Sequence, residues 1–551
     1  MLRRFLLLLL PLLFLLLSGA GLGAYLETND DLTIVGLLRG TSAAAPVTDL
    51  HLYFHGYAAV WAALYRSAPM VPWYALTLYG LLYAATVLGG AVLEKLLRGR
   101  LPGAGLVAFL GLFFGVAWLE HGFWFSYVRV PVLLAGAGVL FAAQRTPARW
   151  ALVLGLLAFG LAWLVRPSAA VLGAVVAAPG AWWLAGRRAG PVLGGAAAWS
   201  LLGALCLHLT WSPEAATFRR LDVLKSNLLD FQLTAPPAQP LTAQDSLALA
   251  AAHRWMLADS TLVNEAFFRR ATPIRPAYFL AHTAPGKLTA TVTQLARDYF
   301  PLLLLLLATW VLAARQRSTE RGFWLVQLAY VGLTLGVGTV LKLPPRLALP
   351  LLDLWVLGNV VYVFQLPALE PTRAARVLLA VLAVAAVPYA YKTAHRRVVL
   401  AQEQQRNRTE RQRLQHVAGR SALLVSDAWE PTFKAESPFN DGPAPPLATY
   451  TLPVLDLQRL AVAGWHTLHP SQAALRQQLT GTRDFTEALR RLGGRPGVAW
   501  VLTPEAAAIL NRQLALRPAS GQPLRVLVPV QPDSGRAERA QLYQMRTKFP
   551  H

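Results

Sequence analysis

Long apolar runs alternate with short charged segments through the first 392 residues of the chain. A transmembrane helix needs about 20 mostly apolar residues. Runs of suitable length and composition lie near 5–25, 73–93, 103–119, 123–143, 149–165, 169–185, 191–211, 298–314, 322–342, 346–366 and 375–392. This pattern predicts an α-helical polytopic membrane protein with eleven transmembrane helices.

A further apolar segment, 51–68, is interrupted by His51, His55 and Arg66, and its aromatic residues suit a membrane interface. If this segment does not span, fourteen basic residues in the loops fall on one side of the membrane. They are Arg3, Arg4, Lys95, Arg98, Arg100, Arg145, Arg149, Arg187, Arg188, Arg315, Arg317, Arg321, Arg373 and Arg376. The positive-inside rule assigns that side to the cytoplasm. We therefore expect a cytoplasmic N-terminus and three outer pieces: residues 26–72, 212–297 and the tail from 393 to 551.

The first 24 residues also resemble a cleavable signal peptide, with a basic start, an apolar centre and small residues at the end. The apolar stretch is long for a signal peptide, and the small residues form no clean A-x-A site. These features favour a first helix that stays in the membrane.

The outer pieces have patterns of their own. Amphipathic spacing near 32–39 and 52–64 predicts two helices along the membrane surface. The piece 212–297 is polar and partly helical. In the tail, a charged helix precedes strand-like runs at 422–427, 498–504 and 524–530, which alternate with helical patterns at 482–494 and 504–516. We therefore divide the chain into a transmembrane domain, 1–392, and an extracytoplasmic α/β domain, 393–551.

Composition supports the membrane interpretation. Of 551 residues, 55% are hydrophobic and 14% are charged, which excludes an ordinary water-soluble globule. A net charge of +23 suggests nucleic acid in a soluble chain, but here many basic residues lie in short loops, where they set topology. No nucleic-acid partner is expected. The single cysteine, Cys206, excludes an intramolecular disulfide and a cysteine-based metal cluster.

Two adjacent carboxylates, Asp30 and Asp31, follow the first apolar run. Charged groups at a membrane rim are costly, so this pair is the strongest pointer to function. The alternative is structural: Asn29 or Asp30 can cap the helix that follows. Neighbours on a helix point about 100° apart, so we expect one carboxylate to enter a site while the other caps the helix.

Several cations stand at the outer ends of apolar runs, against the positive-inside trend. They are Arg166, Lys342 and Arg346, and Arg129 is a candidate for a buried cation. Arginine grips phosphate with two hydrogen bonds, whereas lysine acts as a point charge. The alternative for each outer cation is snorkelling to lipid headgroups. For Arg129 the alternative is an ion pair with Glu120.

The order of these features resembles the GT-C superfamily of membrane glycosyltransferases. In that class an acidic motif follows the first span, the first outer loop carries two surface helices, and a soluble outer tail follows many spans. The segments TNDDLTIVGLLRG, VPWYALTLYGLL, LVRPSA, QDSLALAAAHRWMLAD and AGWHTLHPS are similar to bacterial GT-C-like membrane proteins, most of which lack an assigned function.

The resemblance implies a transferase at the outer face of the bacterial inner membrane. Its donor is a polyprenyl-phosphate-linked sugar, and its acceptor is an envelope glycan, lipid or protein. The catalytic base maps to the NDD motif, with Asp30 slightly favoured over Asp31. Arg166, Lys342, Arg346 and Arg129 are then candidates for holding the lipid phosphate.

Some members of that class need Mg²⁺ or Mn²⁺, and His51 and His55 lie near enough in sequence to bind such an ion with the aspartates. Their spacing matches no metal motif, so surface histidines are the alternative. Two other functions stay open: an envelope lipid or glycan transporter or flippase, and a non-catalytic GT-C-like scaffold.

Overall fold

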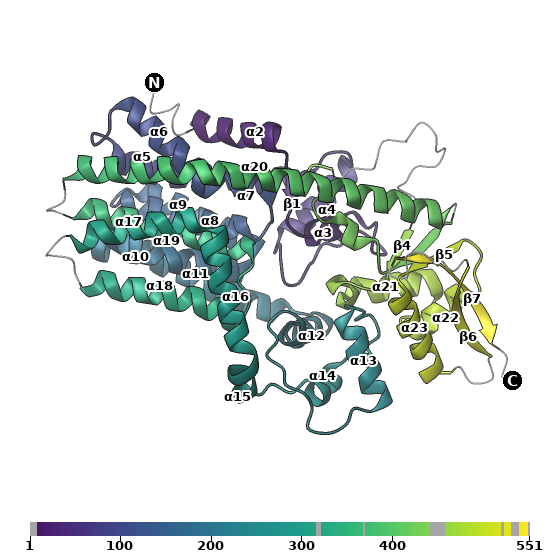
Figure 1. The fold of residues 1–551 in the computed structure, drawn as a ribbon. Coiled ribbons are helices and arrows are strands. Elements are labelled where there is room, and N and C mark those ends of the chain that lie inside the picture. Colours follow the sequence, from purple (N-terminus) through teal and green to yellow (C-terminus); the bar gives the residue numbers. More distant parts are fainter. Residues whose placement is uncertain are drawn as a thin grey trace.

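The computed structural model describes residues 8–315, 321–366, 370–419, 421–440, 458–518, 523–530 and 539–548. These residues are mostly helical, with 72% of them in helices. Long helices lie side by side at one end, and a body containing a small sheet lies at the other (Figure 1). The 48-residue helix α20 (Pro371–Ala418) runs along both parts (Figure 1). The predicted domain boundary at residue 392 therefore falls inside one continuous helix.

Helices occupy the apolar runs predicted from the sequence. They are α2 (Leu10–Leu22), α5 (Trp73–Leu97), α6 (Gly103–Phe113) with η2 (Phe114–Trp118) and α7 (Leu119–Phe123), α8 (Arg129–Gln144), α9 (Arg149–Val165), α10 (Pro167–Ala185), α11 (Gly190–Thr210), α17 (Phe300–Ala314), α18 (Arg321–Val340), α19 (Pro345–Gln365) and the first half of α20. This arrangement agrees with a helical membrane protein.

Six helices among the described residues are long and apolar enough to cross a membrane, or seven if the pair 276–298 and α17, bent by 87°, is one span. One of the six joins α10 and α11 through η3 (Gly186–Ala189), and α2, α8 and α9 are shorter apolar helices of 10–17 residues. The count of eleven spans therefore stays a prediction.

Helices α8 and α19 form the centre of the bundle. Residues 129–143 of α8 and 348–364 of α19 are all buried. Glycines allow the close packing around them: a Cβ at Gly173 of α10 would overlap the Val132 carbonyl, and one at Gly136 would overlap Leu354. Small residues have this role at helix contacts in membranes, where backbones approach closely.

The predicted first outer loop, residues 26–72, contains the two predicted helices, α3 (Asp30–Arg39) and α4 (Tyr57–Ser67). Helix α4 has 11 residues, which is too short to cross a membrane, as expected for segment 51–68. The two-residue strand β1 (Tyr25–Leu26) pairs in parallel with β2 (Trp124–Phe125). This pairing sets the start of the loop beside the segment that leads into α8.

The tail forms a five-stranded sheet. Its order is β4 (Gln458–Ala461), β3 (Leu423–Ser426), β5 (Val498–Leu502), β7 (Gln541–Lys548) and β6 (Leu524–Pro529). Strands β4, β3 and β5 are parallel, and β7 is antiparallel to both of its neighbours. Helices α21 (Pro470–Thr480), α22 (Phe485–Gly493) and α23 (Pro504–Leu516) pack with the sheet. The three strand-like runs are confirmed, whereas β4 and β7 were not predicted.

The second outer loop packs with the tail. It forms α12 (Pro213–Leu229), α13 (Ala243–His253), α14 (Glu265–Ala271), α15 (Pro276–Tyr278), η4 (Phe279–Thr283) and α16 (Ala284–Asp298). Buried side chains of α12 to α14, such as Leu247 and Phe267, belong to one hydrophobic core with Val425, Leu489 and Leu510 of the tail. The sequence-based division assigned this loop to the membrane domain, but its apolar face is covered by the tail.

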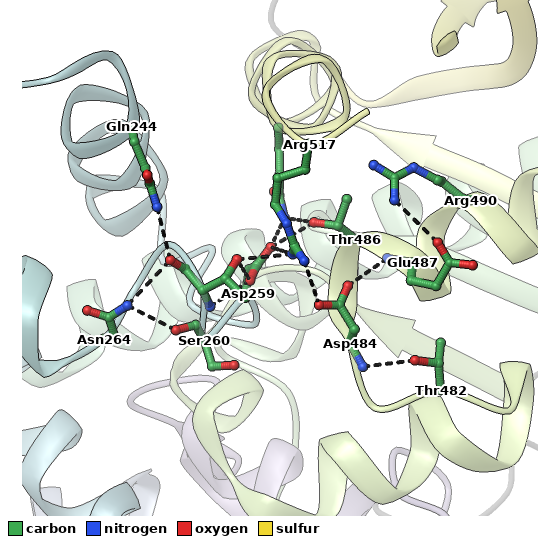
Figure 2. Close-up of polar contacts among 12 residues, drawn as sticks. Gln244, Asp259, Ser260, Asn264, Thr482, Asp484, Thr486, Glu487, Arg490 and Arg517 are labelled. Atoms are coloured by element: carbon green, nitrogen blue, oxygen red, sulfur yellow. Dashed lines mark hydrogen bonds and ion pairs between the residues drawn. The ribbon is translucent and has the colours of Figure 1, made fainter. Parts of the chain in front are cut away.

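Asp259 is the polar centre of this contact (Figure 2). Its carboxylate is 4% exposed and accepts hydrogen bonds from Thr486 Oγ1 at 2.7 Å and Gln513 Nε2 at 2.5 Å. The Arg517 guanidinium lies 3.6 Å away. The Asp259 carboxylate thus accepts hydrogen bonds from two tail helices, α22 and α23, and lies near Arg517, the residue that follows α23.

Replacing Asp259 with alanine should open this interface. Thr486 and Gln513 would lose a buried acceptor, which should lower the free energy of opening by about 3 kcal/mol. Hydrogen exchange of the α13 and α14 amides measures that energy. The matched control is Glu214→Ala, because Glu214 pairs with Arg483 at 3.4 Å but is 64% exposed. Equal exchange in both variants would contradict the assignment.

Candidate functional site

The acidic pair lies where the first outer loop meets the helical bundle. Asp30 and Asp31 are the first two residues of α3. The β1–β2 pairing and the hydrogen bond from the Glu27 amide to the Phe125 carbonyl, 2.8 Å long, hold the preceding residues against segment 124–127. The pair is therefore placed by backbone contacts between two segments about 100 residues apart.

Asp31 points into the protein. Its residue is 1% exposed, and its Oδ1 accepts hydrogen bonds from the Tyr74 hydroxyl at 2.9 Å and the Tyr127 amide at 3.3 Å. Its Oδ2 has no hydrogen-bond partner among the described residues. Burial raises the pKa of Asp31 from 3.8 to about 7, although the Tyr74 hydrogen bond lowers it. This carboxyl group can hold or release a proton near neutral pH.

Asp30 is half-buried and is therefore more exposed than Asp31. Its Oδ2 accepts a hydrogen bond from Thr28 Oγ1 at 3.2 Å. Tyr53, Tyr127 and Arg166 are near enough to feel its charge. Asn29 occupies the N-cap position of α3 without a capping hydrogen bond from its side chain. The expected capping role is thus absent for Asn29, and Asp30 is already inside the helix.

Arg166 lies at the break between α9 and α10. Its backbone is extended, Pro167 starts the next helix, and the residue is half-buried. Its Nη1 donates to the Tyr127 hydroxyl at 3.0 Å, and its guanidinium lies 5.4 Å from the centre of the Tyr53 ring. The predicted outer cation is therefore beside the acidic pair, joined to it through Tyr127.

Arg346, in the first turn of α19, reaches the same place. Its backbone amide and its Nη1 donate to Glu27 Oε1 at 3.3 and 3.4 Å, and its charge acts on Asp31. Its side chain keeps 23% exposure. Lys342, four residues earlier, instead pairs with Asp230 at 3.5 Å. The structure thus brings Arg346 to the acidic pair and directs Lys342 to the second outer loop.

Arg129 lies behind this site. It is fully buried, and its Nη2 donates to Glu27 Oε2 at 2.7 Å, while Nη1 lies 3.4 Å from His121 Nδ1. Its expected alternative partner, Glu120, pairs instead with Arg396 and accepts a hydrogen bond from Tyr389. The pairing with Glu120 was therefore wrong. Arg129 is buried and paired with Glu27, so it holds Glu27 in place and is not accessible to a phosphate.

His51 and His55 lie apart from the two aspartates. His51 pairs with Asp49 at 3.1 Å, and its ring stacks 5.1 Å from that of His469 in the tail. His55 packs 5.8 Å from the Trp163 ring. No group of three or more His, Cys, Asp or Glu side chains in the described part of the chain has a geometry that holds a metal. The suggested Mg²⁺ or Mn²⁺ site stays a prediction, and we derive no step through a metal.

The sequence interpretation missed Glu27, Tyr74 and Tyr127. Glu27 is a third acidic residue in the same ETNDD segment. A carboxylate at the predicted membrane rim is energetically costly, so the sequence alone could have pointed to Glu27. The two tyrosines carry no such signal, because only the folded bundle brings them to Asp31.

Comparison of the chain with protein-family models, with curated proteins and with solved structures finds no match in any of the three. The chemistry of the site is therefore argued from its geometry. It combines a half-buried carboxylate, a buried carboxyl group with a raised pKa, two guanidinium groups and three tyrosines. Such a set can accept a proton from a hydroxyl group and bind an anion next to it.

The raised pKa of Asp31 predicts a pH-dependent stability. The folded protein binds this proton more tightly than the unfolded chain does, so the stabilising contribution is complete below pH about 4 and is lost as the pH rises to about 7. The thermal midpoint of the wild type minus that of Asp31→Asn should therefore decrease as the pH rises from 5 to 7 and stay constant above pH 8. The full contribution is roughly 4 kcal/mol, at about 1.36 kcal/mol per pKa unit. A pH-independent difference between the two proteins would refute the assignment.

Proposed function

We propose that the protein is a membrane glycosyltransferase of the GT-C type. It moves a sugar from a polyprenyl-phosphate carrier to an envelope glycan, lipid or protein at the outer face of a bacterial inner membrane. The observation that carries the proposal is that Arg166, bonded to Tyr127, and Arg346, bonded to Glu27, are both linked at the ends of apolar helices to residues that hold the segment of Asp30 and Asp31. A carboxylate and two guanidinium groups in one place suit proton removal beside a phosphate.

The reaction assigns a role to each group. Asp30 takes the proton of an acceptor hydroxyl, and the acceptor oxygen then forms a bond to the anomeric carbon of the donor sugar. The bond from that carbon to the phosphate oxygen breaks, and polyprenyl phosphate leaves with the electron pair. Arg166 and Arg346 stabilise the negative charge on the leaving phosphate. Attack opposite the leaving group inverts the anomeric configuration.

Asp30 is the better candidate for the base because an acceptor must reach it. Asp30 is half-buried, whereas Asp31 is 1% exposed and has its Oδ1 occupied by Tyr74 and Tyr127. Asp31 instead links α3 to Tyr127 by accepting from its amide. The Tyr127 hydroxyl in turn accepts a hydrogen bond from Arg166. In this account Asp31 positions the partners of Asp30.

Topology completes the proposal. We keep eleven spans, a cytoplasmic N-terminus and an outer tail, because the charge bias of the loops supports them. The site then opens at the outer membrane interface, where the phosphate of a polyprenyl lipid lies while its chain remains among the apolar helices.

A transporter or flippase is the second candidate, and one pair of residues favours it. His121 Nε2 lies 2.7 Å from Asp353 Oδ2, and both side chains are fully buried among the helices. Ionisable pairs within a bundle are often proton or substrate relays. This pair is linked through Arg129 to Glu27.

Two isosteric substitutions test the transferase directly. In lipid-reconstituted protein, Asp30→Asn should lower the release of polyprenyl phosphate by about 100-fold or more, because a general base is lost. Asp31→Asn should have a smaller effect, because its carbonyl oxygen still accepts from Tyr74. The assay supplies a panel of polyprenyl-phosphate sugars and an envelope extract as acceptor.

Full activity of Asp30→Asn would remove the proposed base. No release by the wild type over the whole panel, with lipid movement across vesicles intact, would favour the transporter instead.

A further inference from the structure

A cavity of about 470 Å³ with mixed polar and apolar walls lies between residues that follow α13, α20 and the tail. Its walls include Arg254 and Trp255 after α13, Glu410 of α20, and Asp427, Thr503 and Arg539 of the tail. The volume is within the range of roughly 300–1,000 Å³ found for ligand pockets. None of these residues has a role in the proposed transfer step.

The cavity lies at the carboxyl ends of the parallel strands. Asp427 directly follows β3, and Thr503 directly follows β5. From β3 the chain passes to β4 on one side and later to β5 on the other, so the strand order reverses at β3. Open α/β sheets bind ligands in the crevice at such a reversal. The fold therefore places a binding crevice where the cavity is found.

The base of the crevice is firmly held. Asp427 Oδ1 accepts a hydrogen bond from the Thr503 amide at 2.9 Å, and its Oδ2 accepts one from the Thr503 hydroxyl at 2.6 Å. Thr503 also caps α23 by accepting from the Ala506 amide. The ends of β3 and β5 are thus locked together, which is the preorganisation that a ligand site requires.

Trp255 has an unusual backbone in the wall of the cavity. Its φ is +58°, in the left-handed region that a bulky residue rarely adopts. This position, just after a helix, normally carries glycine or asparagine. Its amide donates to the Ala252 carbonyl and its carbonyl accepts from the Gly464 amide, both at 2.9 Å. A strained residue that the surroundings hold in place is typical of a functional site.

The wall of the cavity continues toward the acidic pair. Ala463 lines the cavity, and Trp465, two residues later, packs edge-on against Tyr53 at 5.7 Å. Tyr53 lies beside Arg166. A ligand that extends from the cavity along this segment would approach the tyrosines around Asp30.

We propose that this cavity binds a glycan segment and thereby holds a carbohydrate acceptor for transfer. The Trp255 ring, 5.2 Å from the Lys225 ammonium, contributes aromatic surface to the wall for the C–H side of a sugar ring. Arg254 and Arg539 offer planar donors for neighbouring hydroxyls, and the Glu410 oxygens, which accept from Arg413, have further lone pairs as acceptors. The role of the bound glycan as an acceptor rests on the proposed function, whereas glycan binding itself does not depend on catalysis.

Binding of defined glycans to the full-length protein in lipid nanodiscs tests the proposal. The probes are fluorescently labelled tetrasaccharides derived from mannan, glucan, galactan and polygalacturonate. At least one should bind, and Arg254→Ala and Trp255→Asn should each weaken it about tenfold or more. Asparagine tolerates the left-handed backbone, and Arg254 is 58% exposed, so both variants should fold.

The matched control is Arg269→Ala. Arg269 is 76% exposed in the same outer loop and pairs with Glu265 at 3.6 Å, as Arg254 pairs with Glu505 at 3.6 Å. This control and Asp30→Asn should bind the glycan as tightly as the wild type. Retained binding by an inactive Asp30→Asn separates this site from the transfer reaction.

Three results would overturn the proposal. They are the absence of binding over the whole panel, equal binding by wild type and both cavity variants, and displacement of the glycan by inorganic phosphate at equal concentration. The last result would identify an anion site in place of a glycan site.

Discussion

The arrangement around the acidic pair depends on one buried carboxylate, Glu27. Its two oxygens contact Arg129 at 2.7 Å and Arg346 at 3.4 Å, and its side chain is 3% exposed. A buried charge is tolerated only with such partners, and removing one partner costs roughly 3–5 kcal/mol. Through Glu27, the loop that carries the aspartates is tied to α8 and α19 at the centre of the bundle. The same bond holds Arg346 near enough to Asp31 for its charge to act on that carboxyl group.

The tail supports this arrangement from outside. The Leu26 amide donates to the Glu436 carbonyl at 2.8 Å, and the Ala435 amide donates to the Leu26 carbonyl at 3.0 Å. Arg408 and Arg411, on the outer half of α20, pair with the Glu436 carboxylate at 2.6 and 3.2 Å. Helix α20 thus fixes the tail segment that borders β1. The tail and the transmembrane part are coupled at the residue next to Glu27.

Much of the fold could be predicted from the sequence because long apolar runs are a local signal. The run 149–165 coincides with α9, and the strand-like runs contain β3, β5 and β6. Strands β4 and β7 were missed because QRLA and QLYQMRTK carry little apolar pattern. The site was predictable only in part: Asp30, Asp31, Arg166 and Arg346 were named, but the partners of Arg129 and Lys342 depend on long-range packing. Arg346 lies four positions after Lys342, and α19 starts between them, so the two cations have different partners.

The most direct measurement is the position of a lipid phosphate bound to the protein. A structure in nanodiscs containing a polyprenyl phosphate would locate that group. We predict a phosphate within hydrogen-bond distance of both Arg166 and Arg346, next to Asp30. A phosphate beside His121 and Asp353 inside the bundle, or at Lys342 with both arginines free of it, would contradict the account.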